Sequence, residues 1–214
     1  MIRFWNVFVK LTGWPAQFFC FRTKVYYEDR KIQSRHIKGP AIIISNHTSV
    51  FDYAVYLFVF FTRTLRFQMA EVLFRKRFLG WLLRRLGGIY VDRDNHSFGF
   101  LSKSQEILSR GGVVGVFPEG RIPRPEETRP LEFKVSAAYL ALNAGVPIIP
   151  VVTNGSYFKK ARARVLIGKP ILAADLIPDG LDEKQALHHV SEQLRQHIIQ
   201  LETQLDGTSK TSKG

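Results

Sequence analysis

The chain has 214 residues, with 31 lysines and arginines against 18 aspartates and glutamates, and a single cysteine, Cys20. Its formal net charge of +13 favours an anionic partner. The candidates are nucleic acid, an anionic membrane surface and a phosphorylated substrate. One cysteine excludes an internal disulfide framework and a cysteine-based zinc site, and the length fits one α/β domain with a full core.

The N-terminal region combines many aromatic residues with scattered polar ones. Residues 1–21 are rich in Phe and Trp, but polar residues such as Lys10 interrupt them. Because no run approaches the roughly 20 apolar residues of a spanning helix, we expect an amphipathic segment that lies on the bilayer. Lys10 also breaks the apolar region that a signal peptide needs. Residues 23–38 are polar and basic, so we expect an extended segment there and group residues 1–38 as one membrane-associating segment.

An apolar run at residues 41–44 opens directly into a polar cluster that holds His47 and Asp52. The β-branched run predicts a buried strand, and ligands of open α/β sheets bind beyond the carboxyl ends of such strands. On one continuous helix the two side chains would lie roughly 140° apart, at ~100° per residue, and would not pair. We therefore expect a turn over residues 46–49 and a helix over residues 52–61, which lets the carboxylate reach the imidazole.

Such a pair can do acid–base chemistry. Asp52 would fix the tautomer of His47, and the other ring nitrogen would accept a proton from a substrate hydroxyl. Taken alone, an HxxxxD pattern is more often a capping group and a turn residue, because short motifs occur frequently by chance.

Strands and helices alternate through most of the remaining chain. The sequence predicts strands over residues 89–91, 113–117, 147–152 and 164–167, and helices over residues 71–86, 97–110, 133–143 and 182–205. This alternation predicts an α/β fold, with a single domain over residues 39–205 and a mixed, largely parallel sheet flanked by helices. The alternation of Arg, Pro and Glu over residues 121–130 predicts an ordered loop over a site or a mobile lid. Residues 206–214 have the composition of a disordered tail.

The helix expected over residues 71–86 places basic residues beside a broad face of Trp, Phe and Leu. That combination is typical of a helix at a membrane interface. Soluble basic helices also pack such a face inward, so the sequence leaves both interpretations open.

Other strand ends carry polar residues that point to an anionic substrate. Arg93 follows the strand over residues 89–91, and its planar guanidinium suits a phosphate. Glu119 follows the strand over residues 113–117, where a carboxylate can bind substrate hydroxyls. In isolation, Arg93 would be a solvated turn residue and Glu119 a helix cap. The motifs GxSxG, GxxxxGK[ST], GxGxxG and HExxH are absent, which argues against serine hydrolases, nucleotide hydrolases, dinucleotide enzymes and zinc proteases.

Four segments in this order carry a family resemblance: NHTSVFD at residues 46–52, GIYVDR at 88–93, FPEG at 117–120 and VPIIPV at 146–151. Each is weak alone. Their order and spacing resemble the glycerophospholipid acyltransferase family, specifically the 1-acylglycerol-3-phosphate acyltransferases, over roughly residues 39–170.

The resemblance implies transfer of a fatty acyl group from acyl-CoA or acyl-carrier protein to the free sn-2 hydroxyl of 1-acylglycerol-3-phosphate (lysophosphatidic acid). The product is phosphatidic acid for phospholipid synthesis. No metal and no organic cofactor is implied beyond the acyl donor, and the expected partner is an anionic membrane surface rather than nucleic acid. The expected location is peripheral or monotopic, on the cytoplasmic face of the cell membrane.

Carried over by position, His47 matches the family's general base and Asp52 its carboxylate partner. The resemblance assigns substrate binding to the other matched residues, which are Arg93, Glu119, Gly120, Arg121 and Lys134. The family commonly continues its third segment with Thr and then Arg, whereas Arg121 and Ile122 follow Gly120 here. The phosphate-binding arginine is therefore either Arg121, shifted by one position, or Arg124.

This departure leaves two alternatives open. The first is an acyltransferase of the same fold that acts on another acceptor, such as a different lysophospholipid or a lyso-ornithine lipid. The second is a non-catalytic basic module that binds nucleic acid or anionic lipid, which the net charge alone supports. The four ordered segments argue against the second.

Overall fold

The computed structural model describes residues 1–92, 98–158 and 162–208. Within them, seven strands form one sheet in the order β1-β7-β6-β2-β5-β3-β4. The strands are β1 (Lys24–Tyr27), β2 (Ala41–Ser45), β3 (Leu65–Ala70), β4 (Ile89–Val91), β5 (Val113–Val116), β6 (Ile148–Thr153) and β7 (Arg164–Ile167). All neighbours pair in parallel except β6 and β7. The expected α/β fold with a mixed, largely parallel sheet is confirmed.

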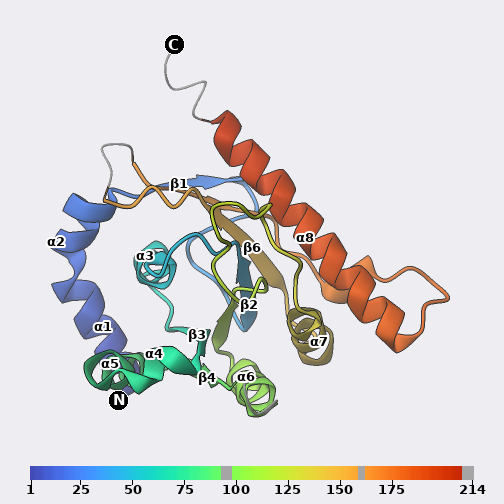
Figure 1. Cartoon of the computed structure of the whole chain (residues 1–214), viewed down its shortest axis with the longest axis horizontal. Coiled ribbons are helices and arrows are strands. Elements are labelled where there is room, and N and C mark those ends of the chain that lie inside the picture. The colour runs from blue at the N-terminus through green and yellow to red at the C-terminus, as the bar shows by residue number, and fades with distance from the viewer. Residues whose placement is uncertain (93–97, 159–161, 209–214) are drawn as a thin grey trace.

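Helices cover both faces of this sheet (Figure 1). One face carries α1 (Ile2–Thr12), α2 (Trp14–Ala16), the π-helical turn η1 (Gln17–Phe21), α3 (Asp52–Val59), α4 (Glu71–Arg75) and α5 (Arg77–Leu86). The other face carries α6 (Gly99–Ser109), α7 (Val135–Ala144), the 3₁₀ turn η2 (Ala173–Leu176) and α8 (Glu183–Gly207). Each helical layer buries its own hydrophobic cluster against the sheet.

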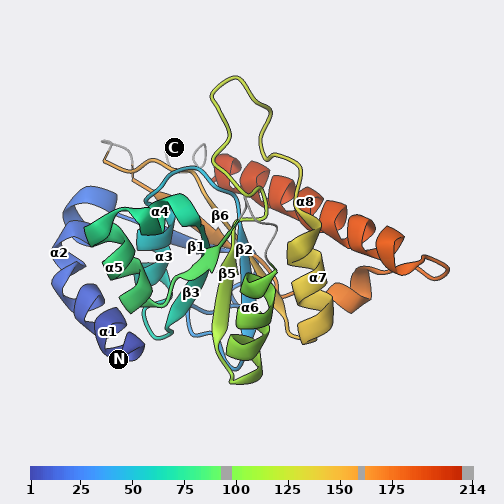
Figure 2. The ribbon, with the colours of Figure 1, turned by 60° about the horizontal axis from the view of Figure 1, so that its bottom comes forward.

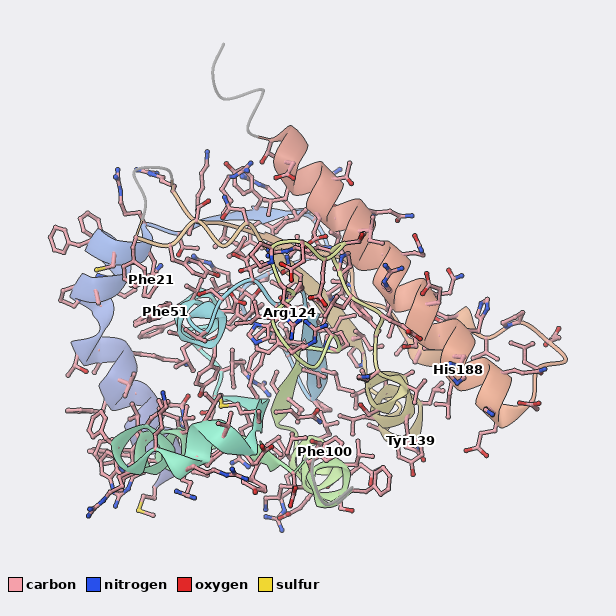
Figure 3. The ribbon with its side chains drawn as sticks, in the orientation of Figure 1. Phe21, Phe51, Phe100, Arg124, Tyr139 and His188 are labelled. Carbon is pink, nitrogen blue, oxygen red and sulfur yellow. The ribbon has the colours of Figure 1, made fainter. Side chains whose placement is uncertain are left out.

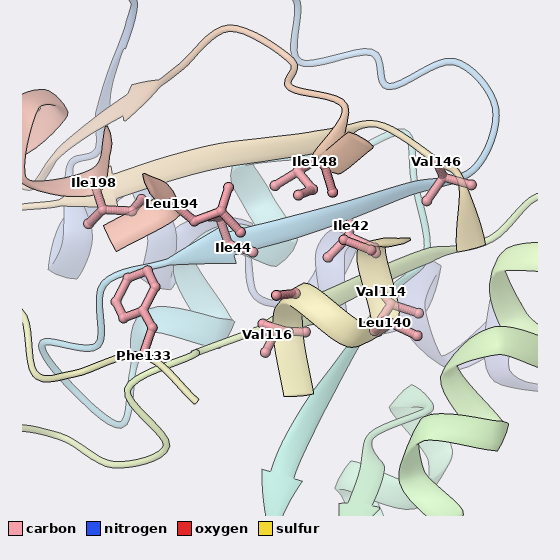
Figure 4. Packing of buried hydrophobic residues seen from close by; sticks show 14 of the residues in the cluster. Ile42, Ile44, Val114, Val116, Phe133, Leu140, Val146, Ile148, Leu194 and Ile198 are labelled. Carbon is pink, nitrogen blue, oxygen red and sulfur yellow. The ribbon is translucent and has the colours of Figure 1, made fainter. Parts of the chain in front are cut away.

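The central strand β2 explains why its sequence is a continuous apolar run. Its side chains alternate between the two faces, because successive residues of a strand point in opposite directions. Ile42 and Ile44 pack in the cluster beneath α7 and α8 (Figure 4), while Ala41 and Ile43 pack in the cluster on the α3 face. A strand covered on both sides needs apolar residues at every position.

Strand β3 was not predicted from the sequence. Its buried residues Leu65, Phe67 and Met69 alternate with the partly exposed Arg66 and Gln68. That alternation with a period of two residues is the signature of a half-buried strand, and it was present in the sequence.

The single helix expected over residues 71–86 is in fact two, α4 and α5. Lys76 has an extended backbone between them, with φ −74° and ψ 118°. The chain folds back tightly at this point: a Cβ atom added at Gly80 would lie only 2.3 Å from the carbonyl oxygen of Phe74. Glycine permits this close approach.

Three further expectations are refined at the ends of elements. The extended segment expected over residues 23–38 contains β1, which pairs with β7 and so joins the sheet. The start of the helix expected at residue 97 lies outside the described residues, and α6 begins at Gly99. Helix α8 continues through Gly207, so it includes the first residues of the expected tail, and residues 209–214 lie outside the described part of the chain.

Helix α1 is amphipathic in an inverted sense. Its outer face exposes large apolar side chains, while Asn6 and Lys10 are buried on its inner face. Asn6 Nδ2 donates to the carbonyl of Leu86, 2.9 Å away, at the end of α5. Lys10 Nζ donates to the carbonyls of Phe61 (2.9 Å) and Arg63 (2.6 Å), just beyond α3. The inner face of α1 therefore supplies donors to the last carbonyl of α5 and to carbonyls of the turn that follows α3.

The apolar outer face of α1 fits the amphipathic N-terminal segment expected from the sequence. Across residues 1–92, 98–158 and 162–208, no helix combines the length and the apolar character needed to cross a bilayer.

We expect the substitution Lys10→Met to lower the free energy of unfolding by roughly 1–3 kcal/mol at pH 7, because it leaves buried carbonyls without a donor. Urea unfolding followed by tryptophan fluorescence measures this change. Lys184→Met, at an exposed position of α8, is the matched control and should change the free energy by less than about 0.5 kcal/mol.

The same variant makes a pH prediction. Burial lowers the pKa of Lys10 from 10.5 to about 8. Between these two values Lys10 binds more protons in the unfolded chain than in the folded chain, so the stability that this side chain contributes rises with pH across this window. The stability difference between wild type and Lys10→Met should therefore grow from pH 8 to pH 10.5. A difference that is constant or shrinks over this range would contradict the buried ammonium.

Candidate active site

His47 and Asp52 meet at the carboxyl end of β2. The strand ends at Ser45, and the chain turns before α3 begins at Asp52. This turn brings His47 Nδ1 to 2.9 Å from Asp52 Oδ2, as the sequence analysis expected. The imidazole side chain is 19% exposed, while the carboxylate is fully buried. With Nδ1 facing the carboxylate, Nε2 is the ring nitrogen left to accept a proton.

Asp52 accepts four further hydrogen bonds. Its Oδ2 accepts from the backbone N–H groups of Thr48 (2.7 Å) and Ser49 (2.9 Å). Its Oδ1 accepts from Thr48 Oγ1 (2.9 Å) and Tyr157 Oη (2.7 Å). Burial and the adjacent carboxylate raise the pKa of Tyr157, so the phenol stays protonated and donates. These donors offset the cost of burying the carboxylate and fix its orientation toward the imidazole.

The FPEG segment after β5 lies directly beside His47. The ring of Phe117 stacks on the imidazole, with centroids 4.1 Å apart and planes 11° from parallel. Glu119 is buried, and its oxygens accept from the backbone N–H groups of His47 (2.8 Å) and Leu131 (2.9 Å). Burial raises the pKa of Glu119. Glu119 therefore ties the turn that carries His47 to the far end of the loop over residues 121–130.

Asn46 fastens the other side of the same turn. Its side-chain amide donates to the carbonyl of Thr153 (2.9 Å) and accepts from the backbone N–H of Thr153 (3.0 Å) at the end of β6. The same Nδ2 also donates to Glu202 on α8, 2.6 Å away. Asn46 belongs to the NHTSVFD segment, but its sequence context predicted no role for it, and no sequence motif marked Glu202.

Tyr157 was also missed, although a signal for it exists. It follows β6, the parallel neighbour of β2, so a side chain just beyond β6 lies at the same edge of the sheet as His47. The loop that carries it approaches closely: Gly155 has φ +61°, and a Cβ atom there would lie 2.7 Å from Thr48 Oγ1. Only glycine suits that position.

Of the remaining predicted site residues, Gly120 and Lys134 lie close to each other, while Arg121 is paired with another residue of its own loop. Gly120 adopts φ +74°, and the side chain of Lys134 passes close to it. Arg121 makes a bidentate pair with Glu127, with nitrogen–oxygen distances of 2.6 and 2.5 Å. Arg121 also holds the pKa of Glu127 at about 2. Arg93 lies outside the described residues.

The loop over residues 121–130 projects beyond the carboxyl edge of the sheet (Figure 2), and Arg124 is exposed on it (Figure 3). Its far end is joined to the His47 turn through Glu119. Among the described residues, no group of three or more His, Cys, Asp or Glu side chains is arranged to hold a metal ion.

An aromatic cluster adjoins the His47 turn on the side of the N-terminal helices (Figure 3). Phe21 of η1 lies edge-on to Tyr157, with ring centroids 5.6 Å apart, and 6.2 Å from Phe51. Phe158 contacts both phenylalanines and is exposed, as is Phe51. The site thus borders an apolar surface that is partly open to solvent.

We expect Tyr157→Phe to lower the free energy of unfolding by roughly 1.5–3 kcal/mol, because it removes a hydrogen bond to a buried carboxylate. Urea unfolding measures the change. Tyr90→Phe, an exposed position on β4, is the control and should unfold like the wild type. Equal effects of the two substitutions would show that the Tyr157 hydroxyl contributes nothing to holding Asp52.

Comparisons with known proteins assign the chain to one family. A family model described as Acyltransferase matches residues 22–154. The 1-acyl-sn-glycerol-3-phosphate acyltransferase of Bacillus subtilis is 30% identical over 147 residues, which cover 66% of this chain and 71% of the relative. The beta form of Homo sapiens is 30% identical over 150 residues, covering 67% of this chain and 52% of the relative. The chain thus spans only about half the length of some relatives.

The crystal structure of the 1-acyl-sn-glycerophosphate (LPA) acyltransferase of Thermotoga maritima has the same fold. It matches with a TM-score of 0.64 at 22% sequence identity, and the match covers 91% of this chain and 78% of that one. The family model spans well over half of the chain and includes His47, Asp52 and Glu119. The chain therefore belongs to the acyltransferase family.

Proposed function

We propose that this chain transfers a fatty acyl group from a thioester donor, acyl-CoA or acyl-carrier protein, to the sn-2 hydroxyl of 1-acylglycerol-3-phosphate, giving phosphatidic acid. The observation that carries the proposal is the His47–Asp52 pair at the carboxyl edge of the central strand. The relatives from Bacillus subtilis and Homo sapiens are named 1-acyl-sn-glycerol-3-phosphate acyltransferases, which supports the choice of acceptor.

The proposed reaction needs a base and a conjugate acid in one place. His47 Nε2 takes the proton of the acceptor hydroxyl as its oxygen attacks the thioester carbonyl. The carbon–sulfur bond then breaks, and the imidazolium returns the proton to the leaving thiolate. Asp52 stabilises the imidazolium between these steps. The donor is already activated, so orientation of the two substrates and general-base assistance, typically about 10² to 10⁴ in rate, account for the protein's share.

The surface around the N-terminal helices supports work on a lipid. Large apolar side chains are exposed along α1, α2 and η1: Phe4, Phe8, Leu11, Trp14, Phe18 and Phe19. Helix α5 adds exposed Phe78 and Trp81, and Arg85 lies over the rings of Trp5 and Trp81. A contiguous aromatic and basic surface suits a peripheral position on an anionic membrane, with the aromatic cluster near Phe21 leading toward His47.

We expect His47→Ala to lower kcat for acyl transfer to lysophosphatidic acid by at least ~10³-fold, because the proton acceptor is lost. The assay uses a thioester donor in detergent or liposomes. The variant should fold and bind liposomes as the wild type does. His188→Ala, an exposed histidine on α8 (Figure 3), is the control with unchanged activity. Retained transfer by a folded His47→Ala enzyme would remove His47 from the mechanism.

One observation favours a second candidate, which is the same reaction on a different lysolipid acceptor. Arg121 is engaged by Glu127, so a phosphate reaches its guanidinium only by displacing that carboxylate. An acceptor without the phosphate monoester would not need this exchange.

The substitution Glu127→Gln distinguishes the two acceptors. If Arg121 binds the acceptor phosphate, weakening its competing partner should lower KM for lysophosphatidic acid roughly 2- to 5-fold, the range of an exposed ion pair. Arg121→Gln should raise KM instead. Glu126→Gln removes the same charge from a neighbouring exposed position of the loop and serves as the control. If KM is unchanged in all three variants and an unphosphorylated acceptor reacts faster, the second candidate is correct.

A further inference from the structure

A shallow groove of about 730 Å³ lies at the edge of the sheet opposite His47. Its walls come from the start of α1, the end of α6 and the turns that precede β3 and β5. These turns lie at the amino ends of strands that run parallel to β2, whereas His47 follows the carboxyl end of β2. Figure 2 shows the N-terminus and the loop over residues 121–130 at opposite ends of the molecule. The groove is therefore separate from the acyltransferase site.

The groove is strongly basic. Its described lining contains five cationic side chains, Arg3, Arg63, Arg66, Lys103 and Arg110, and a single carboxylate, Glu106. Arg63 has a structural role, because its guanidinium donates to the carbonyls of Ile37, Gly39 and Gly111. The other four cations share one carboxylate, which leaves a surplus of three positive charges around the groove.

Glu106 is already used within this group. It pairs with Lys103 at 2.6 Å and with Arg110 at 3.0 Å, and Arg66 adds to the positive field around it. A second hollow of about 310 Å³ shares Arg66 and Lys103 with the groove and adds Arg84 of α5. Cationic side chains thus line two adjoining hollows, which favours an anion that can take charge-assisted hydrogen bonds from more than one of them.

We propose that this groove binds the phosphate headgroup of an anionic lipid, as a second lipid site that takes no part in acyl transfer. The proposal rests on the membrane position proposed above. Arg3 lines the groove from the first turn of α1, and the same helix exposes Phe4, Val7 and Phe8. A lipid with its phosphate between Arg3 and Arg66 can lay its acyl chains along this apolar face. A nucleic acid would leave that face uncovered.

Such a site would orient the domain. A headgroup held at the amino end of α1 fixes one end of that helix at the anionic surface, while η1 at its other end adjoins the aromatic cluster beside His47. The two contacts together set the tilt at which the active-site edge meets the bilayer.

Vesicle co-sedimentation of the full chain tests the proposal. The vesicles are phosphatidylcholine alone, or phosphatidylcholine mixed with phosphatidylglycerol. The groove variant is Arg66→Gln with Lys103→Gln, which keeps the aliphatic stems. The control is Lys169→Gln with Lys184→Gln, which removes the same charge from exposed positions near the end of β7 and the start of α8.

We expect the groove variant to lose roughly 10-fold or more in affinity for the anionic vesicles, since each basic residue near such a surface contributes roughly 5-fold. The control should stay within about 2-fold.

A second pair, Arg3→Gln with Arg110→Gln, changes two exposed side chains and should show the same loss even if the first pair perturbs folding, which circular dichroism monitors. Equal losses in the groove and control variants would overturn the proposal in favour of net charge alone. Inorganic phosphate that competes fully with the vesicles would identify a site for free phosphate instead. A groove variant that weakens duplex DNA binding but not vesicle binding would likewise overturn it.

Activity in detergent separates this proposal from the proposed function. The groove variants should retain wild-type acyl transfer in detergent, because the substituted side chains lie at the edge of the sheet opposite to His47. Failure of the acyl-transfer assay with lysophosphatidic acid would count against the proposed function, while the vesicle measurements would still decide the lipid site.

Discussion

The buried carboxylate of Asp52 is the constraint on which the site depends. A buried carboxylate needs hydrogen-bond donors on both oxygens, and those of Asp52 come from two separate segments. The turn after β2 supplies backbone amides, a hydroxyl and the imidazole, and the loop after β6 supplies the phenol of Tyr157. The phenol reaches Asp52 because the sheet order sets β6 beside β2. The topology of the sheet is therefore a requirement of the chemistry as well as of the core.

The turn that carries His47 is held from both sides. Glu119 binds its backbone from the β5 side, and Asn46 joins it to the end of β6 and to Glu202 of α8. Phe117 stacks on the imidazole itself. With its neighbours fixed in this way, the imidazole has little freedom to leave the geometry in which Nδ1 faces Asp52 and Nε2 is left to accept a proton. A base held in this way lowers the cost of orientation.

The sequence was most informative where chemistry follows a strand. The apolar runs before His47 and Glu119 indicated the strand ends, and the five-residue spacing required the turn that the structure contains. Contacts between residues far apart in the chain could not be predicted from the sequence. Asn46 and Glu202 are 156 positions apart, and the pairing of Arg121 with Glu127 depends on how one loop folds. The break between α4 and α5 was missed because it follows from the fit of Gly80 against a carbonyl, and β3 because its alternation was overlooked.

The polar inner face of α1 limits what the chain can do away from a bilayer. An ordinary amphipathic helix can roll to hide its apolar face against the protein. In this chain, rolling α1 would withdraw Asn6 from the carbonyl at the end of α5 and Lys10 from carbonyls in the turn after α3, leaving buried acceptors unpaired. The aromatic side chains of α1 are thus locked outward whether or not lipid is present. In free solution, only detergent or another protein molecule can shield these side chains from water. The few hydrogen bonds that hold α1 in place therefore also determine the tendency of the protein to self-associate.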